Sequence, residues 1–366
     1  MNDYKLLTPG PLTTTKSVKE EMLKDRCTWD DDYKSITQTI RKQLLQLAQV
    51  NEATYTAVLM QGSGSFVVES VLTTAIGEKD KVLIITNGAY GERIVEMAQV
   101  MRLSHVVYSV PYDEQPSPTE VQAILEADVA ITHVAMVHCE TTTGILNSIE
   151  EIGQVVKSFD KTWIVDAMSS FGGVPMNIAA LQIDYLISSA NKCIQGVPGF
   201  GFVIAKMEEL QKCQGQARSV ALDLYSQWQA MNVDGKWRFT SPTHVVAAFA
   251  KALEELLTEG GVETRYKRYL HNNRLLRTRL NAAGFKAYIT EVWQSPIITT
   301  FLFPYDGFSF THFYEEVKKA GFVLYPGKLT DMDTFRVGNI GDIHEADIQV
   351  LCDVIENYMA VTSNEN

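Results

Sequence analysis

The sequence of 366 residues lacks the features of membrane, secreted and metal-binding proteins. No stretch approaches 18 consecutive apolar residues, which excludes a membrane-spanning helix. The first residues, Met-Asn-Asp-Tyr-Lys, show neither the basic segment nor the apolar run of a secretory signal, so we expect a cytoplasmic location. The five cysteines are scattered and form no Cys-x-x-Cys pair, so neither a disulfide framework nor a metal site is expected.

Positive charge is also scarce. Lysine and arginine total 32 against 44 acidic residues, which gives a net charge of −12 at pH 7. Such a field disfavours nucleic acids and anionic membranes as partners. An anionic ligand would therefore have to be held by local positive potential.

Apolar segments alternate with helical segments through the first 260 residues. We expect buried strands at 55–60, 81–86, 130–138, 162–166, 185–189 and 201–205. A helix is expected at 66–76, and another begins at Ser117 as N-cap, with Pro118 in its first turn and Glu120 as capping-box partner. Strands that are apolar throughout and separated by helices predict an α/β domain with a mostly parallel sheet.

The pattern changes near Gly261 to that of a smaller α+β unit. A helix to Ala283 precedes strands expected at 286–290 and 296–303, a helix at 308–320, strands at 322–325 and 334–339, and a final helix from His344. We therefore predict an N-terminal arm (1–15), a large domain (16–260) and a small C-terminal domain (261–366).

A glycine-rich turn follows the first large-domain strand. Gly62-Ser63-Gly64-Ser65 stands between a strand and a helix, where small residues admit a ligand to the free N–H groups of the helix start. No lysine or arginine adjoins the turn, so helix termini and hydroxyls would balance the charge of a phosphate. The same residues are also typical of an ordinary tight turn with a serine cap.

Two later strands end in charged residues. The segment 162–166 ends at Asp166, and 185–189 is followed closely by Lys192. Ligands of open α/β sheets bind at the carboxyl ends of strands. Pyridoxal 5′-phosphate (PLP) needs a lysine for its Schiff base and an acid beside its ring nitrogen. The pair thus predicts a PLP enzyme, although an ion pair between the two residues is the simpler alternative.

Several motifs, in the same order along nearly the whole chain, resemble the class-V aminotransferases. This family belongs to PLP-dependent transferase fold type I and includes alanine–glyoxylate and phosphoserine aminotransferases. The resemblance is closest to members that move the amino group of 2-aminoethylphosphonate to pyruvate by ping-pong chemistry. The motifs are LTPGPLT (Leu7–Thr13), CTWDDDY (Cys27–Tyr33), DAMSSFGG (Asp166–Gly173), SSANK (Ser188–Lys192), KWRFTSPTH (Lys236–His244) and FRVGNIG (Phe335–Gly341).

The resemblance implies a role for each matching residue. Lys192 and Asp166 would be catalytic, and the cofactor phosphate would be bound by Ser63, Gly64 and Ser65. Tyr90 would stack on the cofactor ring, and Thr141 would lie near its 3-oxygen. Thr240 and Thr243 match positions that reach the phosphate from a neighbouring subunit, which implies a homodimer with shared active sites.

Arg336 matches the family arginine that binds the substrate carboxylate. It would serve both the phosphonate of the donor and the carboxylate of pyruvate, in alternate half-reactions. Arg26, Arg93 and Lys328 remain further candidates for binding anions.

Three alternatives stay open at this point. One is another transaminase of the family, of the alanine–glyoxylate or serine–pyruvate type. A second is a cysteine desulfurase, for which Cys27 or Cys139 would have to supply a thiol on a mobile loop. The third is a non-catalytic phosphate-binding α/β protein.

Overall fold

The computed structural model describes residues 4–327, 329 and 332–363. In that part of the chain a seven-stranded sheet has the order β2-β10-β9-β8-β5-β3-β4. Its strands are β2 (Tyr55–Gln61), β3 (Lys81–Thr86), β4 (Ser104–Ser109), β5 (His133–Val137), β8 (Thr162–Asp166), β9 (Tyr185–Ser189) and β10 (Phe200–Lys206). Only β10 runs antiparallel to its neighbours; the remaining pairs of this sheet are parallel. The predicted mostly parallel α/β architecture is confirmed.

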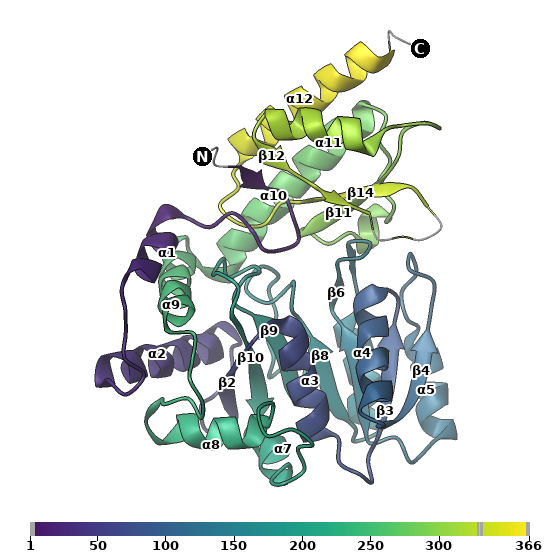
Figure 1. The fold of residues 1–366 in the computed structure, drawn as a ribbon. Coiled ribbons are helices and arrows are strands. Elements are labelled where there is room, and N and C mark those ends of the chain that lie inside the picture. The colour runs from purple at the N-terminus through teal and green to yellow at the C-terminus, as the bar shows by residue number, and fades with distance from the viewer. Residues whose placement is uncertain (1–3, 328, 330–331, 364–366) are drawn as a thin grey trace.

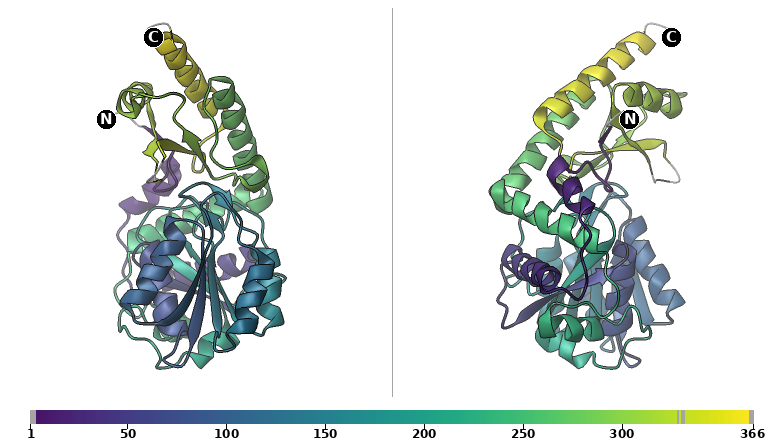
Figure 2. Two further views of the ribbon diagram at one scale, coloured as in Figure 1. Left: turned by 90° about the vertical axis from the view of Figure 1, so that its right-hand side faces the viewer. Right: turned by 60° about the vertical axis from the view of Figure 1, so that its left-hand side comes forward.

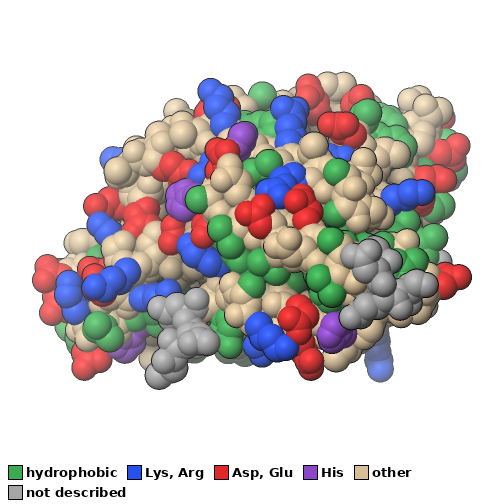
Figure 3. Space-filling model, turned by 90° about the horizontal axis from the view of Figure 1, so that it is seen from above, with side chains coloured by type: hydrophobic (Ala, Val, Ile, Leu, Met, Phe, Trp, Pro, Cys, Tyr) green, Lys and Arg blue, Asp and Glu red, His purple; other side chains and the backbone are tan. Residues whose placement is uncertain are grey.

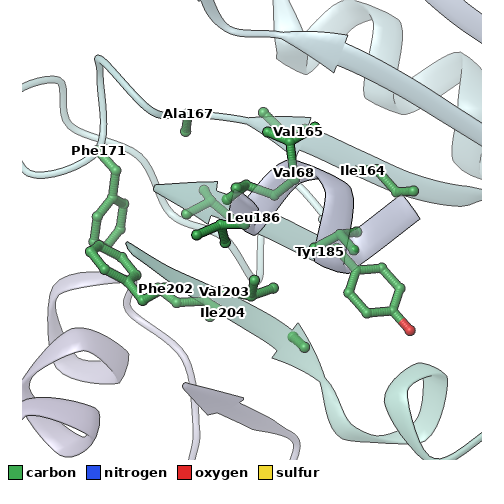
Figure 4. Packing of buried hydrophobic residues seen from close by; sticks show 14 of the residues in the cluster. Val68, Ile164, Val165, Ala167, Phe171, Tyr185, Leu186, Phe202, Val203 and Ile204 are labelled. Atoms are coloured by element: carbon green, nitrogen blue, oxygen red, sulfur yellow. The ribbon is translucent and has the colours of Figure 1, made fainter. Parts of the chain in front are cut away.

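Helices cover both faces of this sheet (Figures 1 and 2). Up to residue 260, the α-helices are α1 (Lys16–Glu20), α2 (Asp31–Leu47), α3 (Gly64–Ala75), α4 (Ala89–Val100), α5 (Pro118–Ala127), α6 (Ile149–Ser158), α7 (Met207–Lys212), α8 (Leu224–Asp234) and α9 (Thr243–Thr258). Because both faces are covered, the central strands β5 and β9 are buried along their whole length. Figure 4 shows this interior, where the rings of Phe171 and Phe202 meet edge-on at 5.7 Å.

Helix α5 begins as predicted, with one correction. The Ser117 hydroxyl accepts a hydrogen bond from the Glu120 backbone N–H. The Ser117 N–H, however, donates to the Tyr108 hydroxyl at 3.2 Å rather than to the Glu120 side chain. The reciprocal half of the capping box is therefore wrong, because an aromatic hydroxyl of the neighbouring strand β4 occupies that position.

The C-terminal part of the chain forms a smaller layer above the sheet (Figure 1). It contains α10 (Gly261–Ala282), α11 (Phe310–Lys319), α12 (Glu345–Ser363), and the antiparallel strands β11 (Ile298–Leu302), β14 (Thr334–Gly338) and β13 (Tyr325–Pro326). These elements share a separate hydrophobic cluster. The strand expected at 286–290 is wrong: Ala287 makes one isolated bridge to Phe301, and the chain then turns into a 3-10 helix at Glu291–Trp293.

The N-terminal arm joins the two layers. Strand β1 (Lys5–Leu6) pairs in parallel with β12 (Phe322–Val323). Leu7 is buried in the smaller cluster, whereas Leu12 belongs to the larger one. The arm therefore passes between the layers, over the edge where the sheet strands end.

The surface carries mixed charge. Seen from the end of the smaller layer, lysine and arginine side chains alternate with aspartate and glutamate (Figure 3). In the described part of the chain, no helix has both the length and the apolarity required to span a bilayer.

Candidate active site

A cavity of about 570 Å³ opens at the carboxyl ends of the sheet strands. It is bordered by the segments that follow β2, β3, β5, β8 and β9, as expected for a ligand site in an open α/β sheet. Six of the predicted site residues line it: Ser63, Gly64, Ser65, Tyr90, Asp166 and Lys192. Their convergence from four separate segments makes this cavity the candidate active site.

The glycine-rich turn fits a phosphate. A Cβ atom on Gly64 would lie 2.6 Å from the Met168 Sδ atom, so a larger residue would require the Met168 side chain to move. Gly62 has φ of +114°, a conformation that favours glycine. Ser63 is the N-cap of α3, yet its side chain makes no capping hydrogen bond. The start of α3 thus presents uncapped N–H groups and a hydroxyl to the cavity, which suits a dianion.

Lys192 lies three residues beyond β9, and its amine donates a hydrogen bond to the Pro9 carbonyl at 2.6 Å. Burial lowers the pKa of this amine, which favours the neutral form that attacks an aldehyde. The turn after Lys192 is held by Arg265, whose guanidinium donates to the carbonyls of Cys193 and Ile194. The lysine is therefore fixed from two sides, by the arm and by α10.

Asp166 is the last residue of β8, which pairs with β9, the strand that precedes Lys192. One carboxylate oxygen accepts a hydrogen bond from the Met168 N–H at 2.9 Å. Burial raises the pKa of this carboxyl group to about 6, against the opposing charges of Lys192 and Arg93. A positively charged ring nitrogen beside it would favour the ionised form.

Tyr90 and Arg336 lie close together at one side of the cavity, although they belong to different layers. Tyr90 lies in the first turn of α4 and lines the cavity. Arg336, on β14, lies outside the cavity lining, and its guanidinium donates to the carbonyls of Thr141 and Pro326, each at 3.1 Å. Burial lowers the pKa of Arg336, and the Tyr90 hydroxyl opposes that shift. The predicted substrate arginine thus lies behind Tyr90 and Thr141, and Thr141 itself is buried outside the lining.

Thr240 and Thr243 are not brought into this cavity. Thr240 is exposed, next to Phe239, whose side chain is 50% exposed. Thr243 begins α9, the helix that the Ser241-Pro242 pair predicted. Within a single chain these two threonines therefore contribute nothing to the site.

The additional anion-binding candidates differ in position. Arg93 lines the cavity, with its guanidinium 5.0 Å from the centre of the Tyr90 ring. Arg26 lies elsewhere and forms an ion pair with Glu21 at 2.6 Å. Lys328 lies outside the described residues.

Ser189 was missed by the sequence analysis. Its hydroxyl is buried at the end of β9, lines the cavity, and has no hydrogen-bond partner among the described residues. An orphaned hydroxyl in a polar site is a natural partner for a phosphate oxygen. Its position could have been inferred from the sequence, because Ser189 is the last residue of the strand that precedes Lys192 and therefore lies at the same edge of the sheet.

The thiol needed for desulfurase chemistry is not favoured by the geometry. Cys139 lines the cavity, but it is 3% exposed within the short strand β6 (Cys139–Glu140), and burial raises the pKa of its thiol to about 12. It is therefore protonated and held rigidly. Cys27 is exposed and does not line the cavity.

Solved structures share this fold. Alanine–glyoxylate aminotransferase from Nostoc sp. matches with a TM-score of 0.90 at 24% identity, covering 98% of this chain and 95% of that one. Pyridoxamine–pyruvate aminotransferase from Mesorhizobium loti matches with a TM-score of 0.89 at 22% identity, covering 98% and 93%. At these identities the likeness shows the fold, which is that of the PLP-dependent transferases of fold type I.

Comparison with known sequences shows the family to which this chain belongs. The model of the class-V aminotransferases matches residues 26–327. A 2-aminoethylphosphonate–pyruvate transaminase from Lysinibacillus sphaericus is 78% identical over 366 residues, with all of both chains covered. One from Bacillus cereus is 58% identical, with 97% of each chain covered. This chain belongs to the class-V aminotransferase family. Membership confirms the expected transaminase class and cofactor, and gives no support to a non-catalytic phosphate-binding protein.

Proposed function

We propose that this chain moves the amino group of 2-aminoethylphosphonate to pyruvate, giving phosphonoacetaldehyde and L-alanine. The observation that carries the proposal is full-length identity of 78% to a transaminase named for these substrates. Lys192 and Asp166 line the same cavity, which supports the PLP chemistry that this reaction needs. A cytoplasmic location belongs to the same proposal, since pyruvate is an intracellular metabolite.

When bound, PLP supplies an aldehyde that takes up the donor's amino group and a ring that withdraws electrons from the adjacent carbon. In our proposal Lys192 holds the cofactor covalently until the donor amine replaces it. The freed amine then accepts a proton from the amine-bearing carbon of the donor and returns it on the cofactor side. Its lowered pKa supports this role, because a neutral amine is needed as the base.

The other cavity residues would hold the cofactor. We assign its ring nitrogen to Asp166 and its phosphate to Ser63, Gly64 and Ser65, supported by the open start of α3. Two further contacts belong to the proposal: Tyr90 stacked on the ring, and Thr141 at its 3-oxygen. An offset aromatic stack contributes about 0.5–1.5 kcal/mol beyond burial.

We assign the anionic end of both substrates to Arg336. A planar guanidinium suits two-point binding of either a phosphonate or a carboxylate. Its two backbone contacts fix the group at the junction of the layers, so the substrate's anionic end would point away from the sheet. Phosphonate and carboxylate would occupy this position in alternate half-reactions.

We further propose a homodimer in which Thr240 and Thr243 reach the cofactor phosphate of the partner's site. Exposure of Thr240 and Phe239 supports this arrangement. Mixed dimers test it: a Lys192→Ala subunit paired with a Thr243→Arg subunit should regain one working site. If each chain builds its own site, the mixture stays as inactive as its parents.

The test of the substrate is a half-reaction. The yellow holoenzyme is mixed with 2-aminoethylphosphonate, and loss of the cofactor's visible absorption band is followed together with formation of phosphonoacetaldehyde. L-Alanine with glyoxylate and L-serine with pyruvate are compared in the same assay. Faster turnover of either pair than of 2-aminoethylphosphonate with pyruvate would overturn the proposed substrate. Lys192→Ala serves as the inactive control.

A further inference from the structure

The start of α4 is capped by residues from a different part of the chain. The N–H of Ala89 donates to the Thr142 hydroxyl at 3.0 Å, and those of Tyr90 and Gly91 donate to one Glu140 carboxylate oxygen at 3.2 Å. The other carboxylate oxygen accepts from the Thr142 N–H and hydroxyl, at 3.1 and 2.6 Å. These contacts satisfy amides that a helix start ordinarily leaves without partners.

The sequence is shaped to admit this carboxylate. The N-cap of α4 is Gly88, which offers no capping side chain. A Cβ atom there would lie 2.3 Å from the Glu140 Cγ atom, so any other residue would displace the glutamate. Glu140 belongs to β6, which lies beside α4 (Figure 1). A glycine on one segment and a glutamate on another thus form a single cap.

The contacts of Glu140 suit its ionised form. Its side chain is fully buried, yet all four of its contacts come from N–H or O–H donors. Burial raises the pKa of the carboxyl group, and the hydrogen bonds of Thr142, Gly91 and Tyr90 oppose that shift. The partial positive charge at a helix start also favours the anion.

The two helix starts at the cavity therefore differ. At the start of α3 the N-cap side chain makes no hydrogen bond to the helix. At the start of α4 the Glu140 carboxyl group accepts hydrogen bonds from the helix N–H groups. Only α3 offers its start to the cofactor phosphate. The cap on α4 instead fixes the residue that its first turn carries toward the cavity, Tyr90.

We propose that Glu140 is a positioning residue, whose carboxylate caps α4 and thereby holds Tyr90 in the plane that stacks on the cofactor ring. This inference rests on the proposed function, in which Tyr90 is the stacking residue. The residue after Glu140 is Thr141, whose carbonyl accepts a hydrogen bond from Arg336. Glu140 would therefore orient both the residue that stacks on the cofactor ring and the arginine that binds the substrate.

The direction in which Glu140→Gln changes PLP affinity distinguishes a positioning role from a purely electrostatic one. The Glu140 charge raises the pKa of Asp166. Removing that charge would favour ionised Asp166 and, taken alone, would strengthen PLP binding. Loss of the cap would instead weaken it. Weaker binding in Glu140→Gln therefore reports positioning.

The experiment is a double-mutant cycle on PLP affinity, measured by titrating apoprotein with PLP and recording visible circular dichroism. The proteins are wild type, Glu140→Gln, Tyr90→Ala and the double variant. We expect Glu140→Gln and Tyr90→Ala each to raise the Kd about tenfold, since hydrogen bonds to a charge and an aromatic stack are each of that order. If Glu140 acts through Tyr90, the double variant binds about as weakly as Tyr90→Ala alone.

Multiplicative losses in the double variant, or an unchanged Kd in Glu140→Gln, would refute the positioning role while leaving the proposed function intact. A wild-type protein that binds no PLP would refute the proposed function itself. Glu140→Asp keeps the charge but not the reach, and should resemble Glu140→Gln. Exposed Glu150, on α6, gives the control Glu150→Gln, expected to be unchanged. If Glu140→Gln does not fold, Thr142→Val removes the hydroxyl of the same cap and should reduce the circular dichroism band.

Discussion

Replacing Asp166 by asparagine should make the cofactor-free protein more stable. Asp166 is 6% exposed, and burial raises the pKa of its carboxyl group from 3.8 to about 6. The folded protein therefore holds this proton more tightly than the unfolded chain does. As the pH rises, the unfolded chain loses the proton first, and the folded state becomes relatively less stable between about pH 4 and pH 6.

The expected magnitude follows from the shift. Each pKa unit corresponds to about 1.4 kcal/mol, so the buried carboxylate destabilises the folded apoprotein by about 3 kcal/mol at pH 8. At pH 5 about half of that penalty remains. Asparagine keeps the oxygen that accepts from the Met168 N–H and removes the charge. For a chain of this length 3 kcal/mol corresponds to a rise in melting temperature of about 4 °C.

The assay is thermal unfolding of both apoproteins at pH 5 and pH 8. The amide group of asparagine adds an offset that does not depend on pH, so the informative quantity is the change in the difference between the two proteins. A difference that is the same at both pH values would refute the reasoning. Saturating PLP should narrow or reverse the order, because only the carboxylate pairs with a charged ring nitrogen.

Three substitutions in and beside the cavity test the assigned roles. Gly64→Ala places a Cβ atom 2.6 Å from Met168 and should weaken PLP binding at least tenfold in an apoprotein titration, with unchanged affinity refuting the phosphate assignment; Gly77→Ala, whose neighbours are the side chains of Gln216 and Asp80, is the control. Lys192→Ala should yield no borohydride-stable cofactor adduct by mass spectrometry, whereas an adduct elsewhere would displace Lys192 from its role. Arg336→Gln should raise the KM for both 2-aminoethylphosphonate and pyruvate by tenfold or more, as loss of a charged hydrogen-bond pair implies, and an effect on one substrate only would contradict a shared arginine.

Sequence reasoning reached the centre of the site because the geometry of parallel sheets is simple. Strands β8 and β9 are adjacent and parallel, so residues at their carboxyl ends meet at one edge. Asp166 and Lys192 could therefore be paired without knowing the rest of the fold. The motif of glycine and serine was equally local, since a strand, a turn and a helix start are contiguous in the chain.

Contacts between distant segments were beyond such reasoning. The Pro9 carbonyl reaches Lys192 because the arm is anchored by pairing of β1 with β12 in the smaller layer. Nothing in the local sequence of the arm encodes that partner. Strand β4 was missed for another reason: as an edge strand whose residues are all exposed or half-buried, it lacks a continuous apolar run.

Glu140 illustrates the same limit one residue before a predicted site residue. The sequence singled out Thr141 as a hydroxyl with a direct role, whereas the glutamate before it has meaning only when α4 is in place. Its burial also explains how an acidic protein can bind anions here. The partial positive charge at the start of α4 offsets part of the carboxylate charge, which weakens its repulsion of a phosphate at the start of α3. Arg93 and the start of α3 then give the cavity a positive potential, although the net charge of the protein is −12.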